Sequence, residues 1–243
     1  MKETRWLALA LTGTLLSGCI ETRPVGVSAT PEYAAREPIA TSLFSSDQAV
    51  LSDEAVARIL SSKLELPAKA KLALMKFPNV DGSRYGGYYW RDEEYIKLQQ
   101  GQVDTLSQAL LASDQIVEVT PLPSLLTPKQ PSIPTLREAA VRMQADLLLV
   151  YRVSSDTYSQ YRAFSKDKVK SYSTCELVLV DVRTGLVPFT RVVSREAIES
   201  KQPIDYDLGE TMRRAEQEAA TTALNVAAND LVGYIKSVPR KGN

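Results

Sequence analysis

Apolar residues after position 50 recur in short runs that predict the strands of one sheet. Runs of about four to eight apolar residues between turn signals are typical of buried strands. The run LLLVYRV predicts a central strand covered on both faces. Pro188 favours an edge position for the last expected strand. The expected strands are 71–77, 116–120, 147–153, 169–182 and 186–195.

Between these runs, apolar residues recur at steps of three and four, which is the spacing of an amphipathic helix. Ser52 is a favourable N-cap for the first expected helix. Thr135 and Glu138 have the spacing of a capping box, so we expect the third helix to begin at Thr135. The prolines between residues 121 and 134 predict no regular element there. The expected helices are 52–62, 92–113, 135–144 and 207–236.

The order of these elements predicts an α/β (α+β) fold in one domain of three layers, with a mixed sheet of about five strands flanked by helices. The long C-terminal helix carries many alanines, which allow close approach to the sheet. We expect this globular domain at 51–238 and a flexible tail at 239–243. The segment 19–50 is rich in Pro, Ser, Thr and Ala, which is typical of a disordered tether.

The amino terminus has the layout of an export signal. Charged residues precede an apolar run at 6–16, and the small residues Ser17 and Gly18 precede Cys19. A helix needs about 20 apolar residues to span a bilayer, so this run is too short to remain as an anchor. We therefore expect a signal peptide at 1–18.

The residues Leu16-Ser17-Gly18-Cys19 resemble the bacterial lipobox. The resemblance implies cleavage before Cys19 and a covalent lipid on its sulfur, so the first expected partner is the lipid bilayer. Two or three acyl chains would anchor the protein firmly. Ile20 stands where an aspartate often signals inner-membrane retention, which favours the outer membrane, facing the periplasm. The competing interpretation is an ordinary secreted protein.

The net charge and the absence of histidine make several classes of function less favourable. Removing residues 1–18 takes away two basic residues and one acidic residue, which leaves a net charge of about minus one. A nearly neutral chain is not expected to bind nucleic acid. The sequence contains no histidine, which removes the usual general base and the commonest metal ligand. We expect no metal and no cofactor other than the lipid on Cys19.

If Cys19 is lipidated, Cys175 has no partner for an intrachain disulfide. It lies inside an expected strand between Thr174 and Glu176, without the positive neighbours that a reactive thiolate needs. A buried structural role is therefore expected in preference to a reactive thiol.

Two short motifs lie at the ends of expected strands. Ala145-Asp146 enters the expected central strand after a helix, and Asp181-Val182-Arg183-Thr184-Gly185 ends a later strand. Both motifs resemble those of a superfamily of periplasmic lipoproteins that includes CsgG, LpoB and the amino-terminal domain of TolB. The resemblance covers about residues 70–236. It implies a non-enzymatic protein-binding, scaffolding or regulatory module of the cell envelope, with an LpoB-like or CsgG-like role.

Asp146 and Asp181 also admit a catalytic interpretation. An aspartate before Thr-Gly more commonly closes a turn through local hydrogen bonds, and Asp146 is expected to bond backbone where its strand begins. No spacing in the sequence sets a pair of catalytic carboxylates, so we expect no enzyme. The alternative is a periplasmic carboxylate-based hydrolase acting on cell-wall material.

Aromatic residues and arginine, which interface centres use, gather in two segments. The first is a glycine-rich loop with Arg84, Tyr85, Tyr88, Tyr89 and Trp90, and the second is an expected hairpin with Tyr158, Tyr161 and Arg162. Both are candidate sites for a periplasmic or outer-membrane protein, including a second copy of this chain. In the alternative interpretation, these aromatics fold back on the core.

Overall fold

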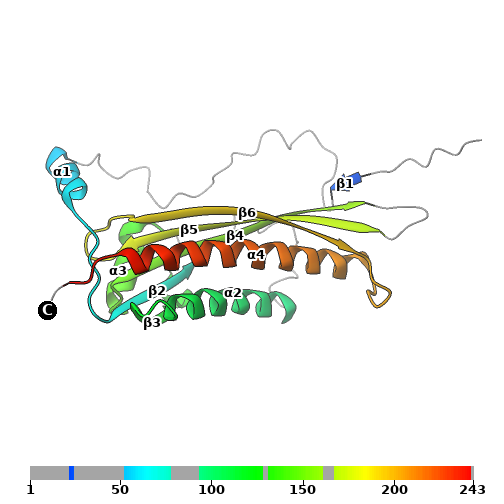
Figure 1. Ribbon diagram of the computed structural model, residues 1–243, viewed down its shortest axis with the longest axis horizontal. Coiled ribbons are helices and arrows are strands. Elements are labelled where there is room, and N and C mark those ends of the chain that lie inside the picture. The colour runs from blue at the N-terminus through cyan, green and yellow to red at the C-terminus, as the bar shows by residue number, and fades with distance from the viewer. Residues whose placement is uncertain (1–21, 25–51, 78–92, 128–130, 161–166, 242–243) are drawn as a thin grey trace, which may run out of the picture.

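The strands form one mixed sheet in the computed structural model, which describes residues 22–24, 52–77, 93–127, 131–160 and 167–241 (Figure 1). Parallel pairing joins β2 to both β3 and β4, and antiparallel pairing joins β4, β5 and β6. A short strand β1 (Thr22–Pro24) from the expected tether pairs antiparallel with β4. The main strands follow the order β3 (Ile116–Pro121), β2 (Ala70–Lys76), β4 (Leu147–Gln160), β5 (Lys168–Asp181) and β6 (Phe189–Ser200).

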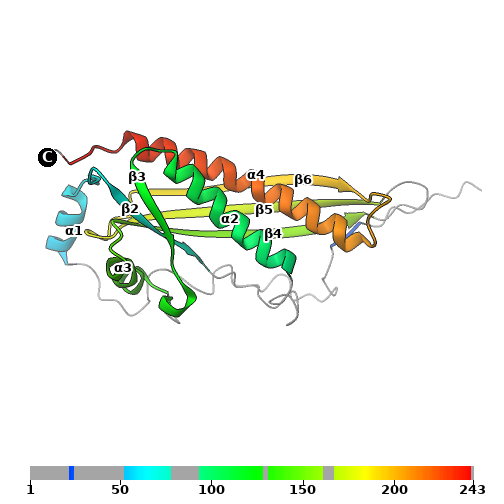
Figure 2. The ribbon, with the colours of Figure 1, turned by 90° about the horizontal axis from the view of Figure 1, so that it is seen from below.

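Helices cover the two faces of the sheet unequally. On one face α2 (Glu93–Leu111) and the long α4 (Leu208–Ser237) lie side by side (Figure 2). On the other face α3 (Ile133–Arg142) packs over one end only, on a smaller apolar cluster. The helix α1 (Asp53–Ser61) has no buried residue and stands at that same end of the sheet (Figure 1). The predicted three-layer α/β fold with a long C-terminal helix is confirmed.

The first half of β4 is the centre of the core, as expected. Leu147 and Leu149 face the cluster under α2 and α4, whereas Leu148 and Val150 face the cluster under α3. All four side chains are buried because the sheet has helices on both sides at this end. Strand β6 lies at an edge of the sheet, as Pro188 indicated.

Two local predictions require correction. Helix α3 begins before Thr135: Ser132 is the N-cap, and Ser132 and Thr135 form the capping box. The helix tolerates Pro134 because first-turn amides have no intrahelical partner, so the missing N–H costs nothing there. Glu138 instead pairs with Arg142 at 2.7 Å.

The second correction concerns the proline-rich connection, where no regular element was expected. Ser124–Leu126 forms one 3-10 turn there, η3.

Strand β5 agrees with its prediction to within one residue, and β6 spans Phe189–Ser200 in place of the expected 186–195. Strand β4 extends well past its predicted limit. The expected central strand ended at Val153, but β4 continues to Gln160. The inward residues of this extension are small and hydroxylated, so an apolar pattern does not reveal them. Ser155 bonds Ser173 at 2.8 Å, and Thr157 bonds Ser171 at 3.2 Å. These cross-strand bonds satisfy buried polar groups that would otherwise be costly.

The last described residues, within the expected tail, pair with the segment before β2. The Leu66 amide donates to the Pro239 carbonyl at 3.0 Å, and the Lys241 amide donates to the Leu66 carbonyl at 2.8 Å. Arg240 donates to the carbonyl of Asp114 at 3.0 Å. These bonds hold the end of α4 at the same end of the sheet as α3.

Candidate functional site

The two motifs that carry the superfamily resemblance meet at one end of the sheet. Asp146 Oδ2 accepts a hydrogen bond from the Lys71 amide at 3.0 Å, and the Asp146 amide donates to the Lys71 carbonyl at 2.8 Å. The Val182 amide donates to the Asp146 carbonyl at 3.0 Å. Arg183 lies 3.4 Å from Asp146 Oδ1. Asp146 therefore ties β2, β4 and the turn after β5 together.

Asp181 binds its own turn, as expected. Its Oδ1 accepts from the Arg183 amide at 3.2 Å, and its Oδ2 accepts a short hydrogen bond from the Thr184 hydroxyl. Gly185 has a φ of 77° and lies against Arg137, so a Cβ there would come within 2.9 Å of the guanidinium. Glycine is needed here because other residues rarely adopt this backbone conformation.

The carboxylates of Asp146 and Asp181 both line a small hollow of about 110 Å³. Two carboxylates facing one pocket would favour the hydrolase alternative. Sites for small molecules usually measure about 300–1,000 Å³. All four carboxylate oxygens of Asp146 and Asp181 already have partners in backbone or side chains. The geometry gives these residues a role in the fold, and it does not favour the carboxylate-hydrolase alternative.

The outer half of the sheet has a different character on the side away from α4. None of the described helices covers this side beyond α3, and half-buried or exposed aromatic, aliphatic and charged residues occupy it along β4, β5 and β6. We call this surface the open face. Its members are Tyr158, Lys170, Tyr172, Val192, Glu196 and Ile198.

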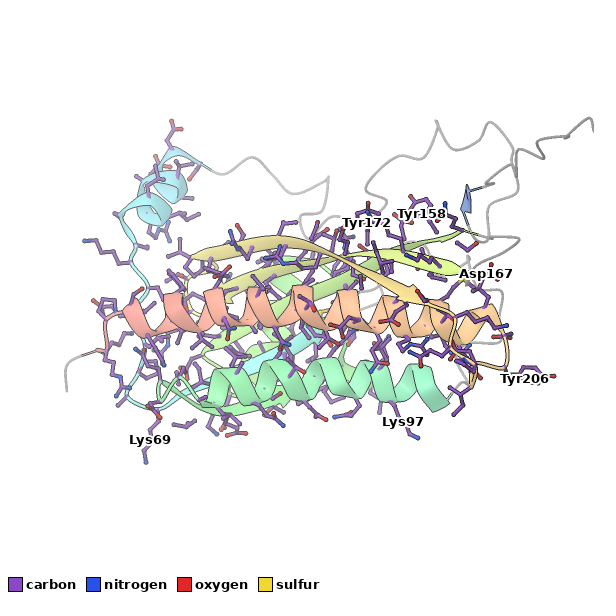
Figure 3. The ribbon with its side chains drawn as sticks, turned by 45° about the vertical axis from the view of Figure 1, so that its right-hand side comes forward. Lys69, Lys97, Tyr158, Asp167, Tyr172 and Tyr206 are labelled. Atoms are coloured by element: carbon purple, nitrogen blue, oxygen red, sulfur yellow. The ribbon has the colours of Figure 1, made fainter. Side chains whose placement is uncertain are left out.

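Contacts across three strands order the open face (Figure 3). The rings of Tyr158 and Tyr172 meet edge to face, with centroids 6.2 Å apart. Lys170 Nζ lies 4.6 Å from the centroid of the Tyr172 ring, a cation–π arrangement. The same amine pairs with Glu196 at 2.8 Å. The hydrogen bond to Glu196 and that to Tyr172 raise the pKa of Lys170, so the lysine stays charged.

A hollow of about 540 Å³ lies at the outer end of this surface, where Gln160 and Lys168 also line it. Tyr158, Tyr172, Lys170 and Ile198 all contribute to its walls. Aromatic residues with a neighbouring charge are the composition of interface centres. The arrangement therefore suits the insertion of an apolar or aromatic side chain from a partner.

Only part of the predicted partner surface can be placed. Tyr158 lies on the open face as described. Tyr161 and Arg162 lie outside the described residues, as do Cys19 and the aromatic loop. That loop contains Arg84, Tyr85, Tyr88, Tyr89 and Trp90.

Sequence reasoning predicted the strand that contains Lys170 and Tyr172, but it did not assign Lys170, Tyr172 or Ile198 to a partner surface, because it did not work out which side chains of paired strands share a face. The available signal was alternation with a period of two: Val169, Ser171 and Ser173 are buried, and their neighbours point outward. Pairing of β5 with β6 then brings Ile198 opposite Lys170.

The interior contains a polar cluster between β2, α2 and α4. Lys76 donates to Gln99 and Gln102, the latter at 3.2 Å. Burial lowers the pKa of Lys76 to about 8, an effect that the charge of Glu216 opposes. Burial also raises the pKa of Glu216. No group of three metal-ligating side chains occurs here or elsewhere among the described residues.

Cys175 is fully buried beneath α4, as predicted, and burial raises the pKa of its thiol to about 12. A thiol with such a pKa is almost entirely protonated at neutral pH and therefore unreactive.

Among the helices that the structure describes, none combines the length and the apolar character that crossing a bilayer requires.

The loop between β6 and α4 is organised around one carboxylate. Asp205 accepts two hydrogen bonds from Arg214 at 2.9 Å, one from the Gln202 amide at 2.7 Å and one from Thr211 at 2.8 Å. The Arg214 bonds, followed by the Gln202 amide, hold the pKa of Asp205 well below its ordinary value.

This depressed pKa predicts a loss of stability in acid. A carboxyl with a lowered folded-state pKa contributes stability above its unfolded pKa of about 4, and that contribution disappears as pH falls through the folded pKa. We expect Asp205→Asn to be less stable than wild type at pH 7, with the two urea midpoints converging below about pH 4. Urea titrations at a series of pH values measure this, and a constant gap between the two curves would contradict it.

Comparisons with known proteins assign no family to the chain. No family model matches the sequence, and no curated protein matches it. A hypothetical protein from Chlamydia trachomatis aligns with a TM-score of 0.41 and 10% identity, over 69% of this chain and 98% of that protein.

Bacterial lipoproteins are among the other structural neighbours. A minor lipoprotein from Acinetobacter baumannii aligns with a TM-score of 0.32 and 12% identity, over 70% of this chain and 97% of that one. A lipoprotein from Neisseria meningitidis aligns with a TM-score of 0.31 and 13% identity, over 66% and 99% of the two chains. These TM-scores are too low to carry a conclusion about function.

Proposed function

We propose that this protein is a lipoprotein of the bacterial cell envelope whose folded domain binds another protein through the open face. The observation that carries the binding role is the ordered group of Tyr158, Tyr172 and Lys170 around an exposed hollow. Solvent-exposed aromatic residues that hold one another in place are favourable for binding because little conformational entropy is lost when a partner docks.

The membrane anchor in this proposal depends on Cys19. Its lipobox-like context supports lipidation, and Ile20 supports an outer-membrane location facing the periplasm. Mass measurement of the amino-terminal peptide from isolated membranes tests the anchor: a diacylglyceryl group on Cys19 supports it, and an unmodified cysteine contradicts it.

The resemblance to the CsgG, LpoB and TolB superfamily supports a non-enzymatic role. The partner is then a periplasmic or outer-membrane protein, in an LpoB-like activation of a cell-wall enzyme, or a second copy of this chain in a CsgG-like assembly. In-cell crosslinking from a photoreactive residue at Ile198, inside the hollow, distinguishes them. Capture of a cell-wall enzyme favours activation, and self-crosslinks alone favour assembly.

We expect Tyr158→Ala or Tyr172→Ala to reduce this crosslinking strongly. Truncating an aromatic residue at an interface centre costs about 2 kcal/mol or more, which corresponds to about 30-fold weaker binding. The matched control is Val141→Ala, which shortens a side chain that is 59% exposed on α3, away from the open face. Equal capture by the tyrosine variants and the control would contradict a binding role for the open face.

The aromatic loop requires its own measurement. A photoreactive residue at Trp90 reports whether the loop contacts the same partner. If alanine at Tyr88, Tyr89 and Trp90 leaves every crosslink unchanged, the loop does not take part in binding.

A further inference from the structure

One row of paired residues defines the end of the sheet farthest from α3. Thr22 pairs with Gln160, Gln160 pairs with Lys168, and Lys168 pairs with Ser200. Neighbouring strands lie about 4.8 Å apart, so this row measures about 15 Å across. We call this end of the molecule the anchor end, because Thr22 is only three residues from Cys19.

The short strand β1 limits where a lipid on Cys19 can lie. Three residues of fully extended chain span at most about 11 Å. Any acyl chain on Cys19 must therefore enter the bilayer close to the anchor end while β1 stays paired. A disordered tether of the expected length would have allowed any orientation, and the pairing of Thr22–Pro24 with β4 removes most of that freedom.

The loop 201–207 carries two exposed apolar side chains at the same end. It directly follows Ser200, and its Ile204 is 87% exposed and its Tyr206 is 91% exposed. Figure 3 shows Tyr206 projecting from the end of the molecule where Asp167 and Tyr158 also lie. The loop is held in shape by the bonds of Asp205, so these side chains are presented to solvent from a rigid support.

We propose that the anchor end rests on the phospholipid surface, with Ile204 and Tyr206 inserted among the lipid headgroups and upper acyl chains. This inference rests on the proposed lipidation of Cys19. Tyrosine is favoured at the membrane–water interface because its ring is apolar and its hydroxyl is polar. Acidic and basic residues are mixed at the anchor end, so it has no strong net charge that would attract charged lipid headgroups. Insertion of apolar side chains is therefore the main contribution to membrane binding.

This docking fixes the orientation of the protein. The sheet then stands away from the membrane, and the opposite end, with α1 and the last turn of α4, faces the periplasm (Figure 1). The open face lies along the side of the molecule, and its hollow opens close to the membrane surface, because Gln160 and Lys168 of the anchor end line it.

The test places benzoylphenylalanine at Ile204 or Tyr206 of the full-length chain in a Gram-negative host. After irradiation, mass spectrometry of the purified protein detects phospholipid adducts, and the acylation of Cys19 is measured on the same sample. The matched control places the probe at Leu60, which is 80% exposed in α1 at the opposite end. We expect at least tenfold more phospholipid adduct at positions 204 and 206 than at position 60.

The docking is contradicted if the three positions give equal amounts of phospholipid adduct. It is also contradicted if positions 204 and 206 give no lipid adduct, or if they capture a protein instead. An acylated Cys19 without these adducts leaves the anchor standing and removes only the docking. Abundant adducts with an unmodified Cys19 support the docking and contradict the proposed anchor. The two proposals therefore fail in distinguishable ways.

Discussion

Replacing Leu149 with alanine is expected to lower the free energy of unfolding by about 2–5 kcal/mol. Leu149 is fully buried in β4, and its strand neighbours in register are Leu74 of β2 and Leu179 of β5. Helices cover both faces of the sheet at this position, so neighbouring side chains have little room to fill the cavity. Urea unfolding measures the change.

The matched control is Leu125→Ala, which removes the same atoms from a side chain that is 95% exposed. A surface substitution of this kind is expected to change stability by no more than about 0.5 kcal/mol. Similar losses in the two variants would show that the first half of β4 is not the centre of the core.

Replacing Ala219 with leucine is expected to cost about 1–3 kcal/mol for the opposite reason, because the larger side chain has no space. Ala219 is fully buried in α4, where the helix faces the hydroxyl-rich half of β4 and β5. The helix backbone approaches the sheet closely there, since the Ser173 hydroxyl lies 3.5 Å from the carbonyl oxygen of Glu216. Small residues on both surfaces allow this approach.

The control for this prediction is Thr221→Leu, an exposed position on the same helix. The same side chain is then introduced without a steric conflict, and its higher helix propensity makes a loss of stability unexpected. For a domain of this size, a cost of 1 kcal/mol lowers the melting temperature by about 2–4 °C, so thermal unfolding separates the variants. Unchanged melting of Ala219→Leu would contradict close packing of α4 on the sheet.

Local patterns in the sequence were sufficient to predict most of the helices and strands and the fold class. The apolar run at Leu147–Val153 predicted the central strand because a continuous apolar run of strand length is typical of a strand covered on both faces. The alanine-rich repeat predicted α4 as the longest helix, and the Asp181 turn followed from the local chemistry of Asp-x-x-Thr-Gly. Each of these features depends on residues that lie next to one another in the chain.

Other features depended on segments that are distant in the sequence. The outer half of β4 was not predicted because its buried side contains serine and threonine. These hydroxyl groups can be buried because Ser171 and Ser173 of β5 form hydrogen bonds with them. The open face was recognised only through Tyr158, since strand pairing brings Lys170, Tyr172 and Ile198 to it.

The sequence by itself predicted an export signal, a lipobox-like cysteine and the three-layer arrangement, because all three predictions depend on short-range composition and apolar periodicity. The tertiary structure decided which polar residues have partners, which aromatic residues share a surface, and that Thr22 pairs at the end of the sheet from which the loop with Ile204 and Tyr206 leaves. These properties arise from strand register and helix docking, which bring together residues as far apart in the sequence as Leu66 and Lys241. No local pattern carries information over such a separation.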